Sequence, residues 1–161
     1  MSKNIIITGT SSGIGFELVK IFAQEKNRVL ALSRDNSKLR GLNLDGVDAI
    51  DFDINNPDEK KLTKFIGSFQ GIDVLINNAG HLVNKPFEET TLSDFKNTYL
   101  TNVFSVAMLI KSTIGHMREG SNVVNISSIG GVQGSVKFPG LSAYSSSKGA
   151  LNILTEMLAE E

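Results

Sequence analysis

The stretch Asn4-Ile-Ile-Ile-Thr-Gly-Thr-Ser-Ser-Gly-Ile-Gly15 joins a short apolar run to the start of an amphipathic segment. The run Ile5–Ile7 is typical of a buried strand, and the glycines that follow it are typical of a tight turn into a helix. Gly9 permits the sharp turn, Gly13 lets the backbone approach a ligand, and Gly15 allows close packing of the helix on the sheet. The exposed N–H groups and the positive end of the helix dipole favour a pyrophosphate there. The stretch therefore predicts a dinucleotide site, with a plain tight turn as the alternative.

Short apolar runs alternate with amphipathic segments along the rest of the chain. The runs expected to be strands are 5–7, 28–32, 48–50, 73–76 and 122–126, and the segments expected to be helices are 16–24, 58–69, 92–117 and 143–161. Three of the strands are almost wholly Val, Ile and Leu, which indicates a parallel sheet covered by helices on both faces. The sequence predicts an α/β fold with a doubly wound parallel sheet, a Rossmann fold, in a single domain over residues 1–161.

Composition excludes several classes of function. The chain has 161 residues with a formal net charge of −1, which leaves no basic footprint for nucleic acid or an anionic membrane. The absence of cysteine excludes disulfides and thiolate metal sites. His81 and His116 have no clustered carboxylate partners, so we expect structural roles for both and no metal site, although His81 could border a substrate. No signal peptide or transmembrane run is present, and we expect a cytoplasmic protein.

The end of the second predicted strand carries the residues that distinguish the two nicotinamide dinucleotides. An acidic side chain there would bind the ribose 2′-hydroxyl of NAD, whereas an arginine can hold the 2′-phosphate of NADP. Ser33-Arg34 favours NADP(H), and Asp35, which follows directly, leaves NAD(H) as the alternative. Asp53, after the third strand, could accept a hydrogen bond from the adenine amino group, or it could cap the turn before Pro57.

Tyr144-Ser-Ser-Ser-Lys148 has the spacing that places two side chains on one face of a helix. A free tyrosine has a pKa near ~10, so a phenol that acts as a base near pH 7 needs about 4 kcal/mol of stabilisation of its anion. A cation about 4 Å away supplies roughly that much at an effective dielectric of about 20. The pair can therefore serve as a proton donor and acceptor, and a helix start with an exposed Tyr and Lys is the alternative.

Five features occur in a fixed order along the chain. They are the turn Thr8–Gly15, Asp53, the tetrapeptide Asn77-Asn-Ala-Gly80, Asn102, and Ser128 followed by Tyr144-Ser-Ser-Ser-Lys148. Together they resemble the short-chain dehydrogenase/reductase superfamily over essentially the whole chain. The combination is far more specific than any one of these motifs taken alone.

The resemblance implies catalytic roles for four residues. Tyr144 would exchange a proton with a carbonyl or alcohol oxygen while hydride moves to or from the nicotinamide. Lys148 would help the phenol to ionise and would bond the nicotinamide ribose. Ser128 would hold the substrate oxygen, a role that Ser127 could also fill geometrically. Asn102 would hold a water in a proton relay, and its alternative is a bond to a neighbouring carbonyl of its helix.

The resemblance also implies a set of cofactor-binding residues that runs from the glycine-rich turn to the last helix. Asn78, Ala79 and Gly80 would line the adenosine ribose, although such a turn also serves simply to end a strand. The full set is Gly9, Thr10, Ser11, Ser12, Gly13, Ile14, Gly15, Ser33, Arg34, Asp53, Ile54, Asn78, Ala79, Gly80, Tyr144 and Lys148.

The chain ends at Glu161 within a predicted helix, whereas the family continues with two more strands and a substrate lobe. We therefore expect a fold truncated after the helix that carries Tyr144 and Lys148, with an unpaired sheet edge. We also expect an uncovered apolar helix face bearing Leu151, Leu154 and Leu158.

The function implied is an NAD(P)(H)-dependent oxidoreductase that interconverts a carbonyl and an alcohol on a small-molecule substrate. The alternative is a dinucleotide-binding fragment or module without useful turnover. The resemblance also implies a homodimer or homotetramer formed through the long helices that contain Asn102 and Lys148.

Overall fold

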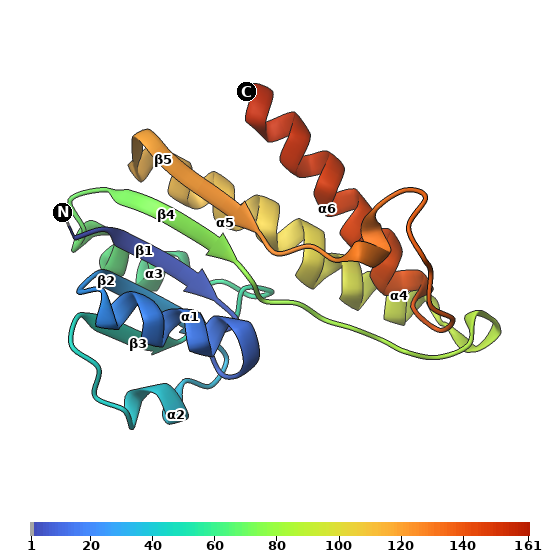
Figure 1. Ribbon diagram of the computed structural model, residues 1–161, viewed down its shortest axis with the longest axis horizontal. Coiled ribbons are helices and arrows are strands. Elements are labelled where there is room, and N and C mark those ends of the chain that lie inside the picture. Colours follow the sequence, from blue (N-terminus) through green and yellow to red (C-terminus); the bar gives the residue numbers. More distant parts are fainter. Residues whose placement is uncertain (1) are drawn as a thin grey trace. The chain divides into compact units, whose positions relative to one another are not determined.

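The computed structural model describes residues 2–161. Its five strands form one sheet in the order β3-β2-β1-β4-β5 (Figure 1). The central strand β1 (Asn4–Thr8) pairs in parallel with β2 (Arg28–Ser33) on one side and with β4 (Ile72–Asn77) on the other. β3 (Val47–Asp51) pairs in parallel with β2, and β5 (Met117–Asn125) follows β4. The strand order therefore reverses between β1 and β4, the position at which sheets of this kind bind ligands.

Two of the inner strands, β1 and β2, are buried on both faces. Ile5–Ile7 in β1 are at most 1% exposed, and Val29–Leu32 in β2 are fully buried. Such strands need cover on each side because successive side chains point to opposite faces of the sheet. The predicted doubly wound parallel sheet is confirmed, and each of the five predicted strands is present.

The chain divides into two compact units, of which the first comprises residues up to Ala79 together with Leu109–Val124. Its helices are α1 (Gly13–Gln24), α2 (Ser37–Arg40) and α3 (Glu59–Gly67). α1 begins inside the glycine-rich turn rather than at Phe16, and α2 has no counterpart in the prediction because a single turn gives no periodic signal. Asp58 caps α3 by accepting a hydrogen bond from the backbone N–H of Lys61.

The second unit comprises Gly80–Met108 and Asn125–Glu161. Its elements are η1 (Phe87–Glu89), α4 (Leu92–Tyr99), η2 (Leu100–Phe104), η4 (Ile129–Gly131) and α6 (Ser142–Glu160). The long helix predicted over 92–117 is a composite. α4 runs through the π-helical turn η2 into α5 (Ser105–Thr113), and the 3-10 turn η3 (Ile114–His116) follows. π turns inside helices often mark functional positions, and Asn102 lies in this one.

The exposed face of α6 differs from the expectation. Leu151 is buried, at 1% exposure, and Leu154 and Leu158 are half-buried. The exposed apolar side chains of α6 are instead Ile153 and Met157. The predicted face was therefore wrong: α4 and η2 pack against α6, and Asn102 of η2 bonds Ser147, which lies one turn before Leu151. β5 lies at the edge of the sheet among residues 2–161, as expected.

Candidate functional site

The glycine-rich turn of the first unit leaves no room for side chains at two of its glycines. Gly9 has a φ of +72°, and a Cβ there would lie 2.7 Å from the Cα of Ala79. A Cβ on Gly15 would collide with the carbonyl oxygen of Gly9 and with the amide of Asn78. Around Gly13, by contrast, the space is open. These surroundings fit the roles predicted for the sharp turn, for close packing and for approach to a ligand.

Asn78 fixes this turn against the end of β4. Its Nδ2 donates to the carbonyl oxygens of Thr8 at 3.0 Å and Gly9 at 3.1 Å. The hydroxyl oxygen of Thr8 accepts hydrogen bonds from the backbone N–H groups of Asn78 and Ala79, both at 3.0 Å. The side chain of Asn78 is thus committed to the turn, and the predicted contact of residues 78–80 with an adenosine ribose stays a prediction.

The first turn of α1 keeps its backbone donors available. Ser12 is the N-cap residue of α1, and its side chain makes no capping hydrogen bond. The N-caps of α3 and α4, Asp58 and Thr91, each accept such a bond. An uncapped helix start with exposed N–H groups suits an anionic ligand.

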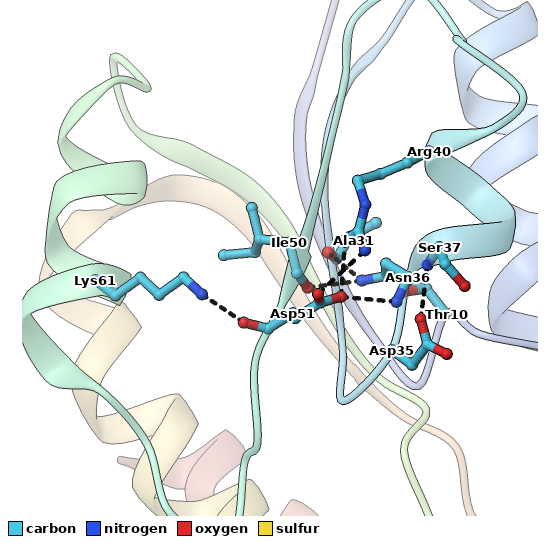
Figure 2. A network of polar contacts seen from close by, with 9 residues as sticks. All are labelled: Thr10, Ala31, Asp35, Asn36, Ser37, Arg40, Ile50, Asp51 and Lys61. Atoms are coloured by element: carbon cyan, nitrogen blue, oxygen red, sulfur yellow. Dashed lines mark hydrogen bonds and ion pairs between the residues drawn. The ribbon is translucent and has the colours of Figure 1, made fainter.

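The loop after β2 contains two neighbouring charged residues in different situations, and Figure 2 draws one of them, Asp35. Asp35 Oδ1 accepts a hydrogen bond from the backbone N–H of Ser37 at 2.8 Å, and this bond holds the pKa of Asp35 below its usual value. Arg34 is exposed and forms no ion pair within residues 2–161. The acidic group that made the sequence ambiguous therefore bonds the backbone of the first residue of α2, and the arginine has no ion-pair partner within the described residues.

Asn36, between Asp35 and α2, is fully buried, and sequence reasoning missed it. Its Nδ2 donates to the carbonyl oxygens of Ala31 at 3.0 Å and Ile50 at 2.7 Å. Its Oδ1 accepts a hydrogen bond from the hydroxyl of Thr10 at 2.8 Å. A polar residue just before a helix is an expected cap, so the pattern gave no sign that this side chain points inward.

An ion pair closes the other side of this loop. Arg40 donates to both carboxylate oxygens of Asp51, at 2.7 and 3.1 Å. The bonds from Arg40 and from the backbone N–H of Asn36 lower the pKa of Asp51, and the Asp51 carboxylate raises that of Arg40. Lys61 of α3 donates to the carbonyl oxygen of Asp51 at 2.6 Å.

Asp53 shows the turn geometry that was its alternative role. Its Oδ1 accepts a hydrogen bond from the backbone N–H of Asn55 at 2.9 Å, and its carbonyl oxygen accepts from the N–H of Asn56 at 3.2 Å. Ile54 is half-buried beside it. Their contacts with a cofactor stay predictions.

In the second unit, Asn102 is bonded differently from its predicted alternative. Its Oδ1 accepts from the backbone N–H of His81 at 2.8 Å, and its Nδ2 donates to the carbonyl oxygen of His81 at 2.9 Å. The same Nδ2 also donates to the hydroxyl oxygen of Ser147 at 2.9 Å. These bonds join the segment that follows Gly80 to α6. No sequence pattern pairs residue 81 with residue 102.

Tyr144 and Lys148 lie one turn apart on α6, as predicted. Lys148 is 4% exposed, and its Nζ donates to the carbonyl oxygen of Ile126 at 2.7 Å. The same atom lies 5.8 Å from the centroid of the Tyr144 ring. Burial lowers the pKa of Lys148. The structure thus places a desolvated amine beside a half-buried phenol.

The two adjacent serines differ in their contacts. The hydroxyl of Ser127 donates to the carbonyl oxygen of Lys148 at 3.2 Å. The hydroxyl oxygen of Ser128 accepts from the backbone N–H of Gly130 at 3.2 Å and caps η4. Ser127 is therefore directed at the backbone of α6.

Residues 2–161 hold no cluster of three or more His, Cys, Asp or Glu side chains that could bind a metal ion. None of their helices combines the length and apolar character that crossing a membrane requires. His81 and His116 are both exposed.

Comparison with known proteins decides the family. The sequence model of the family described as short chain dehydrogenase matches residues 3–161. The chain belongs to this short-chain dehydrogenase family. Carbonyl reductase [NADPH] 2 of Sus scrofa is 32% identical over 161 residues, which cover 97% of this chain and 64% of the reductase.

Solved structures of short-chain dehydrogenases share the fold. A short-chain dehydrogenase from Streptomyces avermitilis superposes with a TM-score of 0.89 at 33% identity, covering 99% of this chain and 60% of that protein. A 4-hydroxyisoleucine dehydrogenase complexed with NADH superposes with a TM-score of 0.87 at 26% identity, covering 99% of this chain and 67% of that protein. This chain thus spans about three fifths to two thirds of the length of these relatives.

Proposed function

We propose that this chain binds a nicotinamide dinucleotide and that its protein interconverts a carbonyl and an alcohol by hydride transfer. The observation that carries the proposal is the buried ammonium of Lys148, 5.8 Å from the ring of Tyr144 on the same helix. Such a cation favours negative charge on the phenol oxygen during proton transfer. The naming of the relatives as reductases and dehydrogenases supports this reaction class.

The residues of the first unit fit a dinucleotide. The positive φ of Gly9, the open space around Gly13 and the uncapped start of α1 suit a pyrophosphate bound through backbone N–H groups. The cofactor, when bound, supplies the hydride chemistry, while the protein supplies orientation and proton transfer. Each of these backbone features belongs to a single compact unit, which supports binding by this part of the chain.

NADP(H) is the cofactor proposed in preference to NAD(H). The ribose 2′-phosphate needs a cation, and Arg34 is exposed without an ion-pair partner within residues 2–161. The ribose 2′-hydroxyl of NAD needs an acidic acceptor, and one carboxylate oxygen of Asp35, Oδ1, is engaged by the backbone N–H of Ser37. The relatives include one named for NADPH and one complexed with NADH, so they favour neither cofactor. The preference for NADP(H) is therefore argued only from Arg34 and Asp35.

In the proposed reaction, Tyr144 donates its phenolic proton to the substrate carbonyl oxygen or receives one from the alcohol. Lys148 stabilises the charge that develops on the phenol, held in place by the carbonyl oxygen of Ile126. Ser128 positions the substrate oxygen with its hydroxyl. Asn102 fixes the backbone of His81 and, through Ser147, the first turn of α6.

Exposed apolar side chains on the helices of the second unit support self-association. Phe104 and Met108 are 55% and 52% exposed, and Ile153 and Met157 on α6 are 60% and 55% exposed. Burying such side chains in a two-fold interface is favourable. A homodimer or homotetramer is the proposed assembly, and light scattering with and without a Met157→Glu substitution tests it.

Dinucleotide binding without turnover is the second candidate. One observation supports this second candidate: the glycine-rich turn, Arg34 and Asn78 all lie in the first unit, whereas Tyr144 and Lys148 lie in the second. Replacement of Tyr144 by Phe separates the two candidates. An enzyme loses turnover of a panel of carbonyl substrates and keeps its affinity for NADPH, whereas a binding module shows no turnover before or after the change.

A further inference from the structure

Asn36 is an amide buried in the middle of an exposed, charged loop. Arg34, Asp35 and Ser37 around it are exposed, whereas Asn36 has no exposed surface. A buried polar side chain is costly unless all its hydrogen-bonding groups are paired. The bonds of this residue therefore show what the loop is attached to.

The side chain of Asn36 joins three separate segments (Figure 2). Its two N–H bonds reach the carbonyl oxygen of Ala31 in β2 and that of Ile50 in β3. Its oxygen accepts the hydroxyl proton of Thr10, which is itself fully buried within the glycine-rich turn. The backbone N–H of Asn36 donates to Asp51 Oδ1 at 2.8 Å. The pair of Thr10 and Asn36, hereafter the amide clamp, thus ties the loop after β2 to the glycine-rich turn.

Only an amide of this length satisfies all three partners. The two carbonyl oxygens require two donors, and the Thr10 hydroxyl requires an acceptor. An amide side chain has both, whereas an ionised carboxylate has no donor and a hydroxyl has only one. Most charged side chains next to the amide clamp also have a partner within the described residues. Arg40 binds Asp51, and Asp35 accepts from the backbone of Ser37, so Arg34 is the charged residue of this loop without a partner inside the described chain.

We propose that the amide clamp of Thr10 and Asn36 is the positioning device that sets the preference for a 2′-phosphorylated dinucleotide. The glycine-rich turn would hold the pyrophosphate, and Arg34 would hold the 2′-phosphate. Both phosphate groups are attached to the same adenosine ribose, which limits how far apart they can lie, so the distance between the turn and the loop affects whether the second contact forms. This inference rests on the proposed binding of NADP(H), and it adds that the side chains of Asn36 and Thr10, which bond each other, act through Arg34, so that any cofactor contact of Thr10 is left to its backbone.

The test compares dissociation constants for NADPH and NADH, measured by nicotinamide fluorescence on the full 161-residue chain. Asn36→Ala is expected to weaken NADPH binding about tenfold and NADH binding less than about threefold, because NADH makes no contact with Arg34. Thr10→Val removes only the hydroxyl and is expected to lower the same preference in the same direction. It serves as the second variant if Asn36→Ala does not fold.

Asn27→Ala is the matched control. Asn27 is also a buried asparagine of the first unit, 8% exposed, but it lies just before β2, where its side chain accepts a hydrogen bond from the backbone N–H of Lys3. Its replacement is expected to lower the melting temperature and to leave the ratio of the two dissociation constants unchanged. A ratio that falls equally in Asn27→Ala and Asn36→Ala overturns the inference, since general destabilisation would then explain both.

Arg34→Ala separates the inference from the proposed function. The preference for NADPH is the dissociation constant for NADH divided by that for NADPH. If Arg34→Ala lowers this ratio while folded Asn36→Ala and Thr10→Val keep it, the inference is overturned and NADP(H) binding stands. If the unaltered chain binds both cofactors equally, or binds neither, the proposed preference fails and the inference fails with it. The double variant Arg34→Ala/Asn36→Ala is expected to be no worse than Arg34→Ala alone, because both changes remove one contact.

Discussion

Replacing Lys148 by Met tests whether the buried ammonium assists proton transfer at Tyr144. Methionine keeps the length and the apolar stem but removes the charge. Two unit charges 5.8 Å apart, the distance from Lys148 Nζ to the Tyr144 ring centroid, interact by about 3 kcal/mol at an effective dielectric of about 20. If that energy acts on the charge developing on the phenol oxygen, turnover falls about a hundredfold in Lys148→Met.

The assay is steady-state oxidation of NADPH with a panel of carbonyl substrates, followed with melting temperature on the same samples. Lys111→Met, at an exposed lysine of α5, is the matched control and is expected to retain turnover. A Lys148→Met variant that keeps its turnover within about threefold would contradict the proposed role of the ammonium, since a charge–charge interaction of about 3 kcal/mol predicts a loss about thirty times larger.

The burial of Lys148 also makes the free energy of unfolding depend on pH. Burial lowers its folded-state pKa below the unfolded value of 10.5, so the unfolded chain binds more protons between the two values. The free energy of unfolding then rises with pH through that window, and the cost of the buried cation is fully present below it. The difference between wild type and Lys148→Met is therefore expected to move in favour of the wild type as pH rises toward 10.5, as measured by urea unfolding.

Three further predictions concern single side chains. Asn102→Ala removes three hydrogen bonds and is expected to lower the free energy of unfolding by about 2–4 kcal/mol in denaturant titrations. Gly15→Ala is expected to destabilise by about 1–3 kcal/mol because its Cβ meets packed atoms, whereas Gly67→Ala in α3 meets open space and is expected to be neutral or stabilising; calorimetry compares the two. The bonds from Lys85 and Thr91 lower the pKa of Asp94 to about 2, so its stabilising contribution is complete above pH 3.8 and is lost as pH falls toward 2. Acid unfolding of wild type against Asp94→Asn measures this contribution, and identical acid curves would contradict it.

The sequence was sufficient for the strands and for the glycine-rich turn because both depend on local patterns. The runs around Ile6 and Leu30 identify buried strands by composition alone, and the surroundings of Gly9 and Gly15 explain why no other residue fits there. The spacing of Tyr144 and Lys148 likewise gave their common helix face. Such patterns can be read from the sequence because the period of a helix or strand fixes which side chains share a face.

The sequence was insufficient where a polar side chain chooses between distant partners. Asn102 bonds the backbone of His81 rather than its own helix, and Asn36, in the loop after β2, bonds Thr10 in the glycine-rich turn after β1. Both asparagines sit at positions where a local capping or helical role was equally reasonable. Leu151 is buried for a related reason, since the packing of α4 and η2 on α6 is not visible in the pattern of α6 alone.

We propose above that the first unit holds a nicotinamide dinucleotide and prefers the phosphorylated form. Titration of the chain with NADPH and with NADH, followed by nicotinamide fluorescence with the intact mass checked, tests this binding most directly. We expect saturable binding of both cofactors, with a dissociation constant about tenfold or more lower for NADPH, because only NADPH has the 2′-phosphate that Arg34 would bind. Equal affinities, or no binding of either cofactor at millimolar concentration, would contradict it.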